Sequence, residues 1–197
     1  YDAVHINAEF SGATRPSDHD PQVVLLHIPV PNAAPTNLVI SNDDIAENSA
    51  AGTAVGTLSA TDRATDVLTY SLTDDAGGRF AVDAVTGVIT AVGPLDFESA
   101  ASYDVLARVT DQGGLFTELT VTIDVTNVNE GPTAVSNTIM VDEDASSANL
   151  WDLLLGNDFD PDAGDTLTIT GTAGTTLGTV QFDPVARTLV YVADNAS

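Results

Sequence analysis

Short stretches of alternating apolar and polar residues fill the sequence from residue 38 to residue 128. In residues 105–109 and 119–125, for example, every second residue is apolar. A period of two places successive side chains on opposite faces of a β-strand, and these stretches are rich in residues that strands favour, such as threonine, valine and isoleucine. Glycine and aspartate clusters separate them, as turns would. The pattern predicts an all-β fold, an antiparallel β-sandwich with Greek-key connections.

A second β-patterned unit occupies residues 136–197. We expect strands at Thr166–Thr170, Gly178–Phe182 and Thr188–Val192, and one short helical turn around Leu150–Leu155. A sandwich of this kind needs about seven strands, and the chain ends before that number is complete. The second module is therefore expected to be an incomplete sandwich.

Segments that contain proline divide the chain into modules. Residues 29–36 contain three prolines, which favour an extended path over a helix or a central strand. A later segment echoes it in its small residues and its Pro-Thr ending, which indicates modules in tandem. We expect an N-terminal segment at 1–30, a linker at 31–36, a module at 37–128, a linker at 129–135 and a second module at 136–197.

The chain is strongly acidic. It contains 29 aspartates and glutamates against 5 arginines and no lysine, for a formal net charge of −24. Because 43% of its residues are hydrophobic, it should fold and carry a negative surface rather than behave as a disordered tail. Scattered arginines cannot neutralise a run of phosphates, so these modules are not expected to bind nucleic acid. Crowded carboxylates attract cations, and calcium would relieve their mutual repulsion.

Two further absences narrow the class of protein. The sequence has no cysteine, which excludes disulfides and thiolate metal sites. No run of residues approaches the about 18 apolar residues of a membrane-spanning helix. We therefore expect no membrane partner for these modules.

Residues 36–132 carry five short motifs in a fixed order. They are Ala46-Glu47-Asn48, Ala60-Thr61-Asp62, Leu95-Asp96-Phe97-Glu98, Thr110-Asp111-Gln112-Gly113 and Val128-Asn129-Glu130-Gly131-Pro132. Their order and spacing resemble a cadherin repeat, in the form common in bacterial surface proteins. The resemblance implies an extracellular, calcium-binding sandwich whose ligands come from the facing ends of adjoining modules and meet at the linker.

Calcium takes about six to eight oxygen ligands, and the residues that match the family's ligand positions offer carboxylate and amide oxygens. The resemblance implies a site at the second linker. Its ligands would be Glu47, Asp96 and Glu98 of the first module, Asn127, Asn129 and Glu130 of the linker, and Asp158, Asp160 and Asp162 of the second module. Asn127 and Glu130 stand where the family has aspartates, so we expect weaker or fewer calcium ions than in animal cadherins. The alternative is that these residues form turns and a solvated surface.

A weaker site is implied at the first linker. It would use Asp62, Asp66 and Asp111, with Asn32 from the linker, which is half of the expected ligand set. The family's Asp-x-Asp pair is spread here over residues 62–66 and has an arginine inside it. We therefore expect poorer calcium binding at this end.

The second unit carries a related set of motifs. Val141-Asp142-Glu143-Asp144, Leu154–Asp162 and Gly164–Ile169 resemble another bacterial cadherin-like repeat. The aspartates at every second position of its loop are also similar to the calcium loop of helix-loop-helix proteins. That alternative is disfavoured, because the glycine and the closing glutamate that such a loop needs are missing.

The N-terminal segment contains Asp2–Glu9 followed by Arg15–Pro21, which includes a Ser-Asp-His sequence. On these residues, segment 1–30 resembles the C-terminal end of a DNase I-like endonuclease, exonuclease or phosphatase domain. The resemblance implies that His19 is the general base on the attacking water and that Asp18 helps hold Mg²⁺ or another divalent metal. The alternative is a surface histidine among turn-forming acids. Because the rest of such a site is absent, we expect no catalysis by this chain.

Together these motifs favour calcium-stiffened spacer or adhesion modules of a secreted, multidomain bacterial protein, located after the catalytic domain of an extracellular nuclease. The partners would be neighbouring modules of the same chain and a cell-surface or homophilic adhesion partner. One alternative is an inactive piece of a metal-dependent phosphodiesterase or nuclease. A carbohydrate-binding sandwich is disfavoured, because such modules display aromatic platforms and Trp151 is the only tryptophan.

Overall fold

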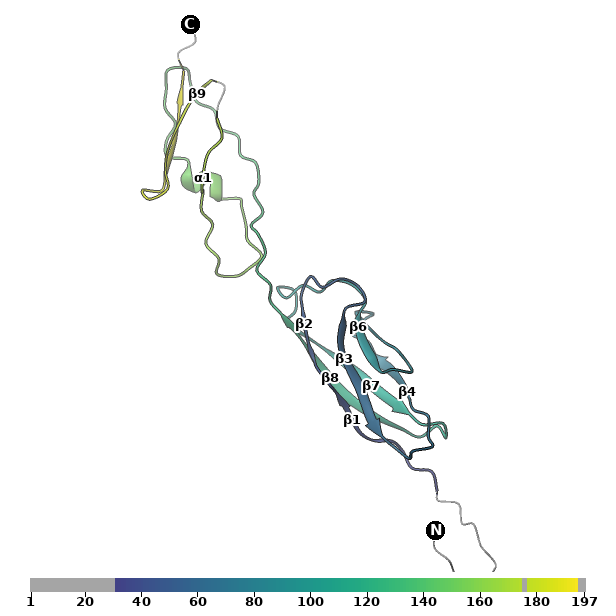
Figure 1. The fold of residues 1–197 in the computed structure, drawn as a ribbon. Helices are drawn as coiled ribbons and strands as arrows, with labels where there is room; N and C mark the ends of the chain where they lie inside the picture. The colour runs from purple at the N-terminus through teal and green to yellow at the C-terminus, as the bar shows by residue number, and fades with distance from the viewer. Residues whose placement is uncertain (1–30, 175–176, 195–197) are drawn as a thin grey trace, which may run out of the picture.

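The computed structural model describes residues 31–174 and 177–194, and almost all of its regular structure is β. Two four-stranded sheets face each other between residues 36 and 126 (Figure 1). In the first sheet, with the order β1-β3-β6-β5, the strands are Thr36–Ile40, Ala54–Thr61, Val88–Ala91 and Phe80–Val82. In the second, with the order β2-β8-β7-β4, they are Asp44–Ala46, Phe116–Thr126, Ser102–Thr110 and Thr69–Asp74. The predicted β-sandwich is confirmed.

Alternating residues of the two sheets form one core. The inward positions of β7 and β8 are Val105, Ala107, Val109, Val121, Ile123 and Val125, all of them buried. Leu58, Phe80 and Ile89 belong to the same core and come from the opposite sheet. Burying an apolar side chain of this size contributes about 1.5–3 kcal/mol. The alternation therefore fixes which face of each strand lies inside.

One end of the sandwich gathers the segments that carry most of the predicted ligands. β2 pairs with β8 in parallel, so that Ala46 lies opposite Thr126, and the Glu47 N–H donates to the Thr126 carbonyl at 3.0 Å. The Asn48 N–H donates at 3.0 Å to the carbonyl of Leu95, in the turn after β6. Three segments remote in sequence therefore meet where β8 enters the second linker.

The second unit is built on one hairpin and one helical turn. β9 (Gly178–Asp183) pairs with β10 (Thr188–Ala193) in antiparallel fashion, and α1 covers Trp151–Leu155. Trp151 is 1% exposed, and its ring stacks on that of Phe182 with centroids 6.0 Å apart. The helical turn and these two strands confirm the prediction.

The strand predicted at Thr166–Thr170 is wrong. Leu167 and Ile169 are half-buried and their neighbours in sequence are exposed, so the alternation itself is real. Residues 166–170 nevertheless join no sheet within the described part of the chain. Periodicity predicts which side chains turn inward, but a strand also needs a neighbouring strand to share its backbone hydrogen bonds.

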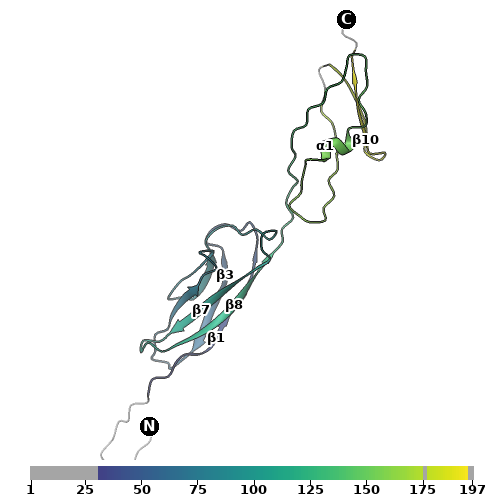
Figure 2. The same cartoon turned by 180° about the vertical axis from the view of Figure 1, so that it is seen from behind.

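The two units follow one another end to end in both views (Figures 1 and 2). A short connection carries β8 into the second unit, where the Thr133 N–H donates to the Phe159 carbonyl at 2.8 Å. This pairing holds the linker against the acidic loop of the second unit. Within the residues that the structure describes, no helix is long and apolar enough to cross a membrane.

Candidate metal centre

Three glutamate side chains converge at the end of the sandwich that faces the second unit. Glu47 follows β2, Glu98 lies in the turn between β6 and β7, and Glu130 lies in the second linker. Each offers a carboxylate oxygen within 4.8 Å of the others. Glu47 is only 3% exposed, whereas Glu130 is half-buried and Glu98 is exposed. This glutamate cluster therefore runs from the protein interior to the surface.

Two backbone N–H groups from different segments hold the Glu47 carboxylate. The Phe97 N–H donates to Oε2 and the Val128 N–H donates to Oε1, each at 2.8 Å. These hydrogen bonds tie the turn before β7 and the linker to the end of β2. Because each carboxylate oxygen has two lone pairs, Glu47 can still accept a further ligand.

Asp162 brings the second unit to the same place. It is 9% exposed, and its Oδ1 accepts a hydrogen bond from Asn127 Nδ2 at 2.9 Å while its Oδ2 accepts one from the Glu130 N–H at 2.6 Å. Asn127 Nδ2 also donates to Glu98 Oε1 at 3.1 Å. A carboxylate of the second unit therefore contacts the linker beside the glutamate cluster.

These four carboxylates repel one another. Desolvation, together with the charges of the other three, raises the pKa of Glu98 above its ordinary value. Asn48 Nδ2 donates a hydrogen bond to Glu130 Oε1, whereas Glu130 Oε2 is buried and has no hydrogen-bond partner in the described structure. Among the described residues, no arginine forms an ion pair with any of the four. A cation from outside the chain would therefore be needed to balance the repulsion among the four carboxylates.

The donor set fits a hard divalent cation. Calcium prefers carboxylate and other oxygen ligands, about six to eight of them, and some can be backbone carbonyls or water. A buried polar atom without a partner, like Glu130 Oε2, is rare in folded proteins and calls for an explanation such as an ion. The side chains that would hold the cation are Glu47, Glu98, Glu130 and Asp162.

A second group of acids lies in the loop of the second unit. Asp160, Asp162 and Asp165 offer carboxylate oxygens within 4.8 Å of one another. The Asp162 N–H donates to Asp160 Oδ1 at 3.2 Å, and the Asp165 N–H donates to the Asp162 carbonyl at 3.2 Å. Asp165 is not among the predicted ligands, and its only sequence signal is its place at the end of the acidic run.

Three of the predicted ligands engage their side chains in hydrogen bonds with other protein groups. Asp96 accepts hydrogen bonds from the Ser99 hydroxyl at 2.9 Å and from the Ser99 N–H at 3.0 Å, which lower the pKa of Asp96. Asp158 Oδ1 accepts a backbone N–H at 2.7 Å, and Asn129 Nδ2 donates to the Glu130 carbonyl at 2.7 Å. Asp96 and Asp158 lie outside both acidic groups of the described residues.

The acids predicted at the first linker lie at the opposite end of the sandwich, where Asp62 follows β3 and Asp111 follows β7. Asp111 is 5% exposed. Its Oδ2 accepts a hydrogen bond from Asn32 Nδ2 at 2.7 Å, and its Oδ1 accepts the N–H groups of Gly113 and Leu115 at 2.8 and 2.9 Å. Burial raises the pKa of Asp111, but these hydrogen bonds outweigh it, so the pKa lies below its ordinary value.

Asp66 lies beside the same loop, because Gln112 Nε2 donates to Asp66 Oδ1 at 3.1 Å. Asp62 Oδ2 and Asp66 Oδ2 are buried without a hydrogen-bond partner in the described structure. Over the residues described, however, Asp62, Asp66 and Asp111 do not form a group in which all three carboxylates lie within 4.8 Å of one another. This end offers a less complete set of ligands than the glutamate cluster.

The predicted catalytic pair, Asp18 and His19, lies outside the described residues, as does the rest of segment 1–30. The structure therefore leaves the nuclease-like interpretation of that segment as a prediction.

Two family models match the chain. Residues 42–126 match the Cadherin domain model, and residues 129–197 match the Bacterial Ig domain model. The first module is therefore cadherin-like, and the second is similar to bacterial Ig domains. The boundary between the two matches falls directly after β8, beside the glutamate cluster.

Several relatives share this similarity over part of their length. Human protocadherin beta-1 is 37% identical over 71 residues, which are 34% of this chain and 9% of that protein. Protocadherin Fat 2 of Rattus norvegicus is 28% identical over 165 residues, 81% of this chain and 4% of that protein. The crystal structure of the protocadherin gammaB4 extracellular domain has a TM-score of 0.51 at 22% identity, over 86% of this chain and 28% of that chain, and shows the fold alone. The chain spans less than a tenth of these two curated relatives.

Proposed function

We propose that the chain forms calcium-binding cadherin-like spacer or adhesion modules, at 37–128 and 136–197, of a secreted extracellular protein. The observation that carries this proposal is the convergence of Glu47, Glu98 and Glu130 from three segments, with no ion-paired arginine beside them in the described structure. Such a cluster of like charges opposes folding at neutral pH unless a cation compensates it. Bound calcium would supply that compensation.

Calcium at the glutamate cluster would also stiffen the joint between the modules. Asp162 of the second module contacts Asn127 and the Glu130 N–H directly. A cation that takes oxygens from both modules adds charge-based links to these hydrogen bonds. Without calcium, the joint depends on Asp162 and on the pairing of Thr133 with Phe159, while the carboxylates around it repel one another. Removal of calcium should therefore leave a hinge.

Small-angle X-ray scattering tests the joint. We expect the wild-type protein in calcium to give a narrower distribution of interatomic distances than the same protein in EDTA, because calcium fixes the modules end to end. Glu130→Gln removes one charge of the cluster and should give the broad distribution in both buffers. Glu118→Gln is the matched control, since Glu118 pairs with Arg108 at 2.7 Å on a sheet face. If the wild-type protein gives the same distance distribution in calcium and in EDTA, the proposal is refuted.

Self-association separates the adhesion role from the spacer role. The adhesion role, with a homophilic partner, predicts a concentration-dependent dimer in calcium by sedimentation velocity. A protein that stays monomeric at all concentrations supports the spacer role, in which the partners are the neighbouring modules of the same chain.

The location of the modules in a longer bacterial protein belongs to the same proposal. The resemblance of residues 1–30 to the end of a DNase I-like domain supports a position behind a metal-dependent nuclease domain. This chain is expected to be inactive, because thirty residues cannot supply such a site. Metal-dependent cleavage of DNA by the purified chain would contradict that expectation.

A further inference from the structure

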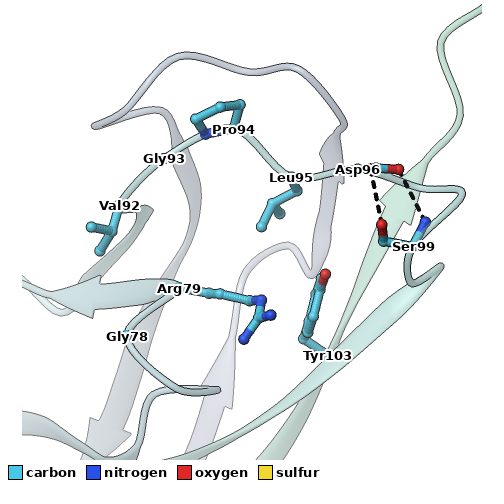
Figure 3. Close-up of a pocket in the computed structure, with 9 residues that line it drawn as sticks. All are labelled: Gly78, Arg79, Val92, Gly93, Pro94, Leu95, Asp96, Ser99 and Tyr103. Atoms are coloured by element: carbon cyan, nitrogen blue, oxygen red, sulfur yellow. Dashed lines mark hydrogen bonds between the residues drawn. The ribbon is translucent and has the colours of Figure 1, made fainter.

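A surface hollow of about 390 Å³ lies between the segments that flank the β5–β6 hairpin and the start of β7 (Figure 3). Its lining combines the apolar side chains of Leu95 and Pro94 with polar groups of Arg79, Asp96 and Tyr103. Its volume falls in the range of small-molecule sites, about 300–1,000 Å³. Asp96 is the one predicted calcium ligand that lines the hollow, and the structure places it outside the glutamate cluster.

The guanidinium of Arg79 lines the hollow and has no acidic partner among the described residues. Its Nη1 donates to the Ala76 carbonyl at 2.8 Å, but it forms no ion pair with any carboxylate of the described residues. By contrast, two guanidinium nitrogens of Arg108 donate to Glu118. In a chain with 29 acidic residues, an arginine without an acidic partner is unexpected. The free N–H groups of Arg79 are therefore available to an anion from outside.

The guanidinium of Arg79 is held in position by an aromatic ring. Its carbon lies 4.9 Å from the ring centroid of Tyr103, a cation–π contact. The Tyr103 ring in turn packs edge-on against the buried Phe80, with centroids 6.1 Å apart. In Figure 3 the guanidinium points toward this ring, and the Tyr103 hydroxyl points toward the side of Leu95 and Asp96. The anion-binding group is thus fixed before any ligand arrives.

The other end of the hollow has the opposite charge. Asp96 is tied down by the two hydrogen bonds from Ser99, and its carboxylate still has lone pairs that can accept hydroxyl groups. It would also repel a second anionic group on a ligand. The hollow therefore favours a ligand with a single carboxylate at one end and hydrogen-bond donors at the other, and it disfavours phosphates and polyanions.

We propose that this hollow binds a small sugar acid, with the carboxylate on Arg79 and the hydroxyl groups toward Asp96 and the Tyr103 hydroxyl. A planar guanidinium can bind a carboxylate through two parallel hydrogen bonds, which gives both affinity and orientation. Recognition here depends on a charged group and not on an aromatic platform, because Arg79 already covers a face of the Tyr103 ring. No residue of the glutamate cluster lines the hollow, so a test in calcium-free buffer can fail without bearing on the calcium proposal.

Titration of the isotope-labelled chain followed by amide NMR tests this proposal. The ligands are glucuronate, glucose, acetate and phosphate, in calcium-free buffer so that chelation of calcium by glucuronate does not contribute. We expect saturable shifts with glucuronate, centred on Arg79, Gly93 and Tyr103, at least about tenfold tighter than with glucose, acetate or phosphate. No saturation with glucuronate, or equal affinity for acetate, would overturn the proposal.

Two variants and one control assign the binding to the hollow. Arg79→Gln should weaken glucuronate at least about tenfold, whereas Arg108→Gln, with the same charge change on the other sheet, should leave it unchanged. Tyr103→Phe keeps the ring beneath Arg79 and should reduce the preference for glucuronate over acetate. Retention of wild-type affinity in a folded Arg79→Gln protein would overturn the assignment. If that variant does not fold, full selectivity in Tyr103→Phe would overturn it instead.

Discussion

Glu98 shares its surroundings with three other carboxylates, and desolvation together with their charges raises its pKa in the folded protein. A group whose folded pKa lies above its unfolded pKa stabilises the fold at low pH, and this contribution is lost as the pH rises through the folded pKa. Above its folded pKa the metal-free protein has therefore lost this contribution. A bound cation would reverse the sign, because it favours the ionised form.

Glu98→Gln should consequently change stability in opposite directions with and without calcium. In EDTA at neutral pH the variant should melt at a higher temperature than the wild type, because one repulsive charge is gone. In calcium it should melt at a lower temperature, because one ligand is gone. Thermal melts by circular dichroism in both buffers measure this. A shift of the same sign in both buffers would contradict the proposed role of Glu98.

The pKa of Asp111 is shifted in the opposite direction. Burial raises this pKa, but hydrogen bonds from Asn32, Gly113 and Leu115 outweigh burial and leave it below the ordinary value. Its contribution to stability is present above the unfolded pKa of about 4 and is lost as the pH falls through the folded pKa. Asp111→Asn should therefore destabilise the protein clearly at pH 7 and much less near pH 2. Urea unfolding at the two pH values measures the difference, and a difference independent of pH would contradict this account.

At the scale of elements, the β5–β6 and β9–β10 hairpins turn in the same way. Asp83 Oδ1 and Asp183 Oδ1 each accept the backbone N–H groups two and three residues later, at 2.7–3.0 Å. The residue before the returning strand is Gly87 in one hairpin and Arg187 in the other, with φ of 73° and 53°. A left-handed backbone costs an L-residue free energy that glycine does not incur.

Arg187→Gly is therefore expected to stabilise the second unit by about 0.5–1 kcal/mol, the steric gain being reduced by loss of the Arg187 contact with the Trp151 ring. The reciprocal change, Gly87→Ala, should destabilise the first unit by about 1–3 kcal/mol, because a Cβ there would lie 2.6 Å from the Leu58 carbonyl oxygen. Urea unfolding measures both. Destabilisation by Arg187→Gly would show that the ring contact outweighs the backbone cost.

The sandwich was predictable from sequence because β7 and β8 bury every second residue over long stretches, which indicates strands with one buried face. The error at Thr166–Thr170 arose because the same alternation does not reveal whether a partner strand exists. The direction of side chains within loops could not be predicted from the sequence either. Asp96 and Asp158 stand at expected loop positions, yet Asp96 accepts the N–H of Ser99, three residues later, and Asp158 accepts the N–H of Val135, which is remote in sequence. Spacing alone cannot exclude either hydrogen bond.

At the scale of the whole molecule, the acidic charge of the chain favours the end-to-end arrangement of its two modules. A formal net charge of −24 weakens compact association of the modules, so an extended shape with few contacts at the joint suits such a surface. At the joint, Asp162 of the second module lies beside the glutamates of the first module and the linker. Calcium at that point would offset local repulsion while the rest of the surface stays negative.

Isothermal titration calorimetry with calcium tests this account most directly. The wild type is compared with the double variant Glu98→Gln and Glu130→Gln, and with Glu118→Gln, whose side chain pairs with Arg108 on a sheet face. We predict saturable binding that the double variant weakens at least about tenfold and that Glu118→Gln leaves largely intact. Absence of binding to the wild type, or unchanged affinity in the Glu98 and Glu130 double variant, would contradict the proposal that calcium joins the modules at the glutamate cluster.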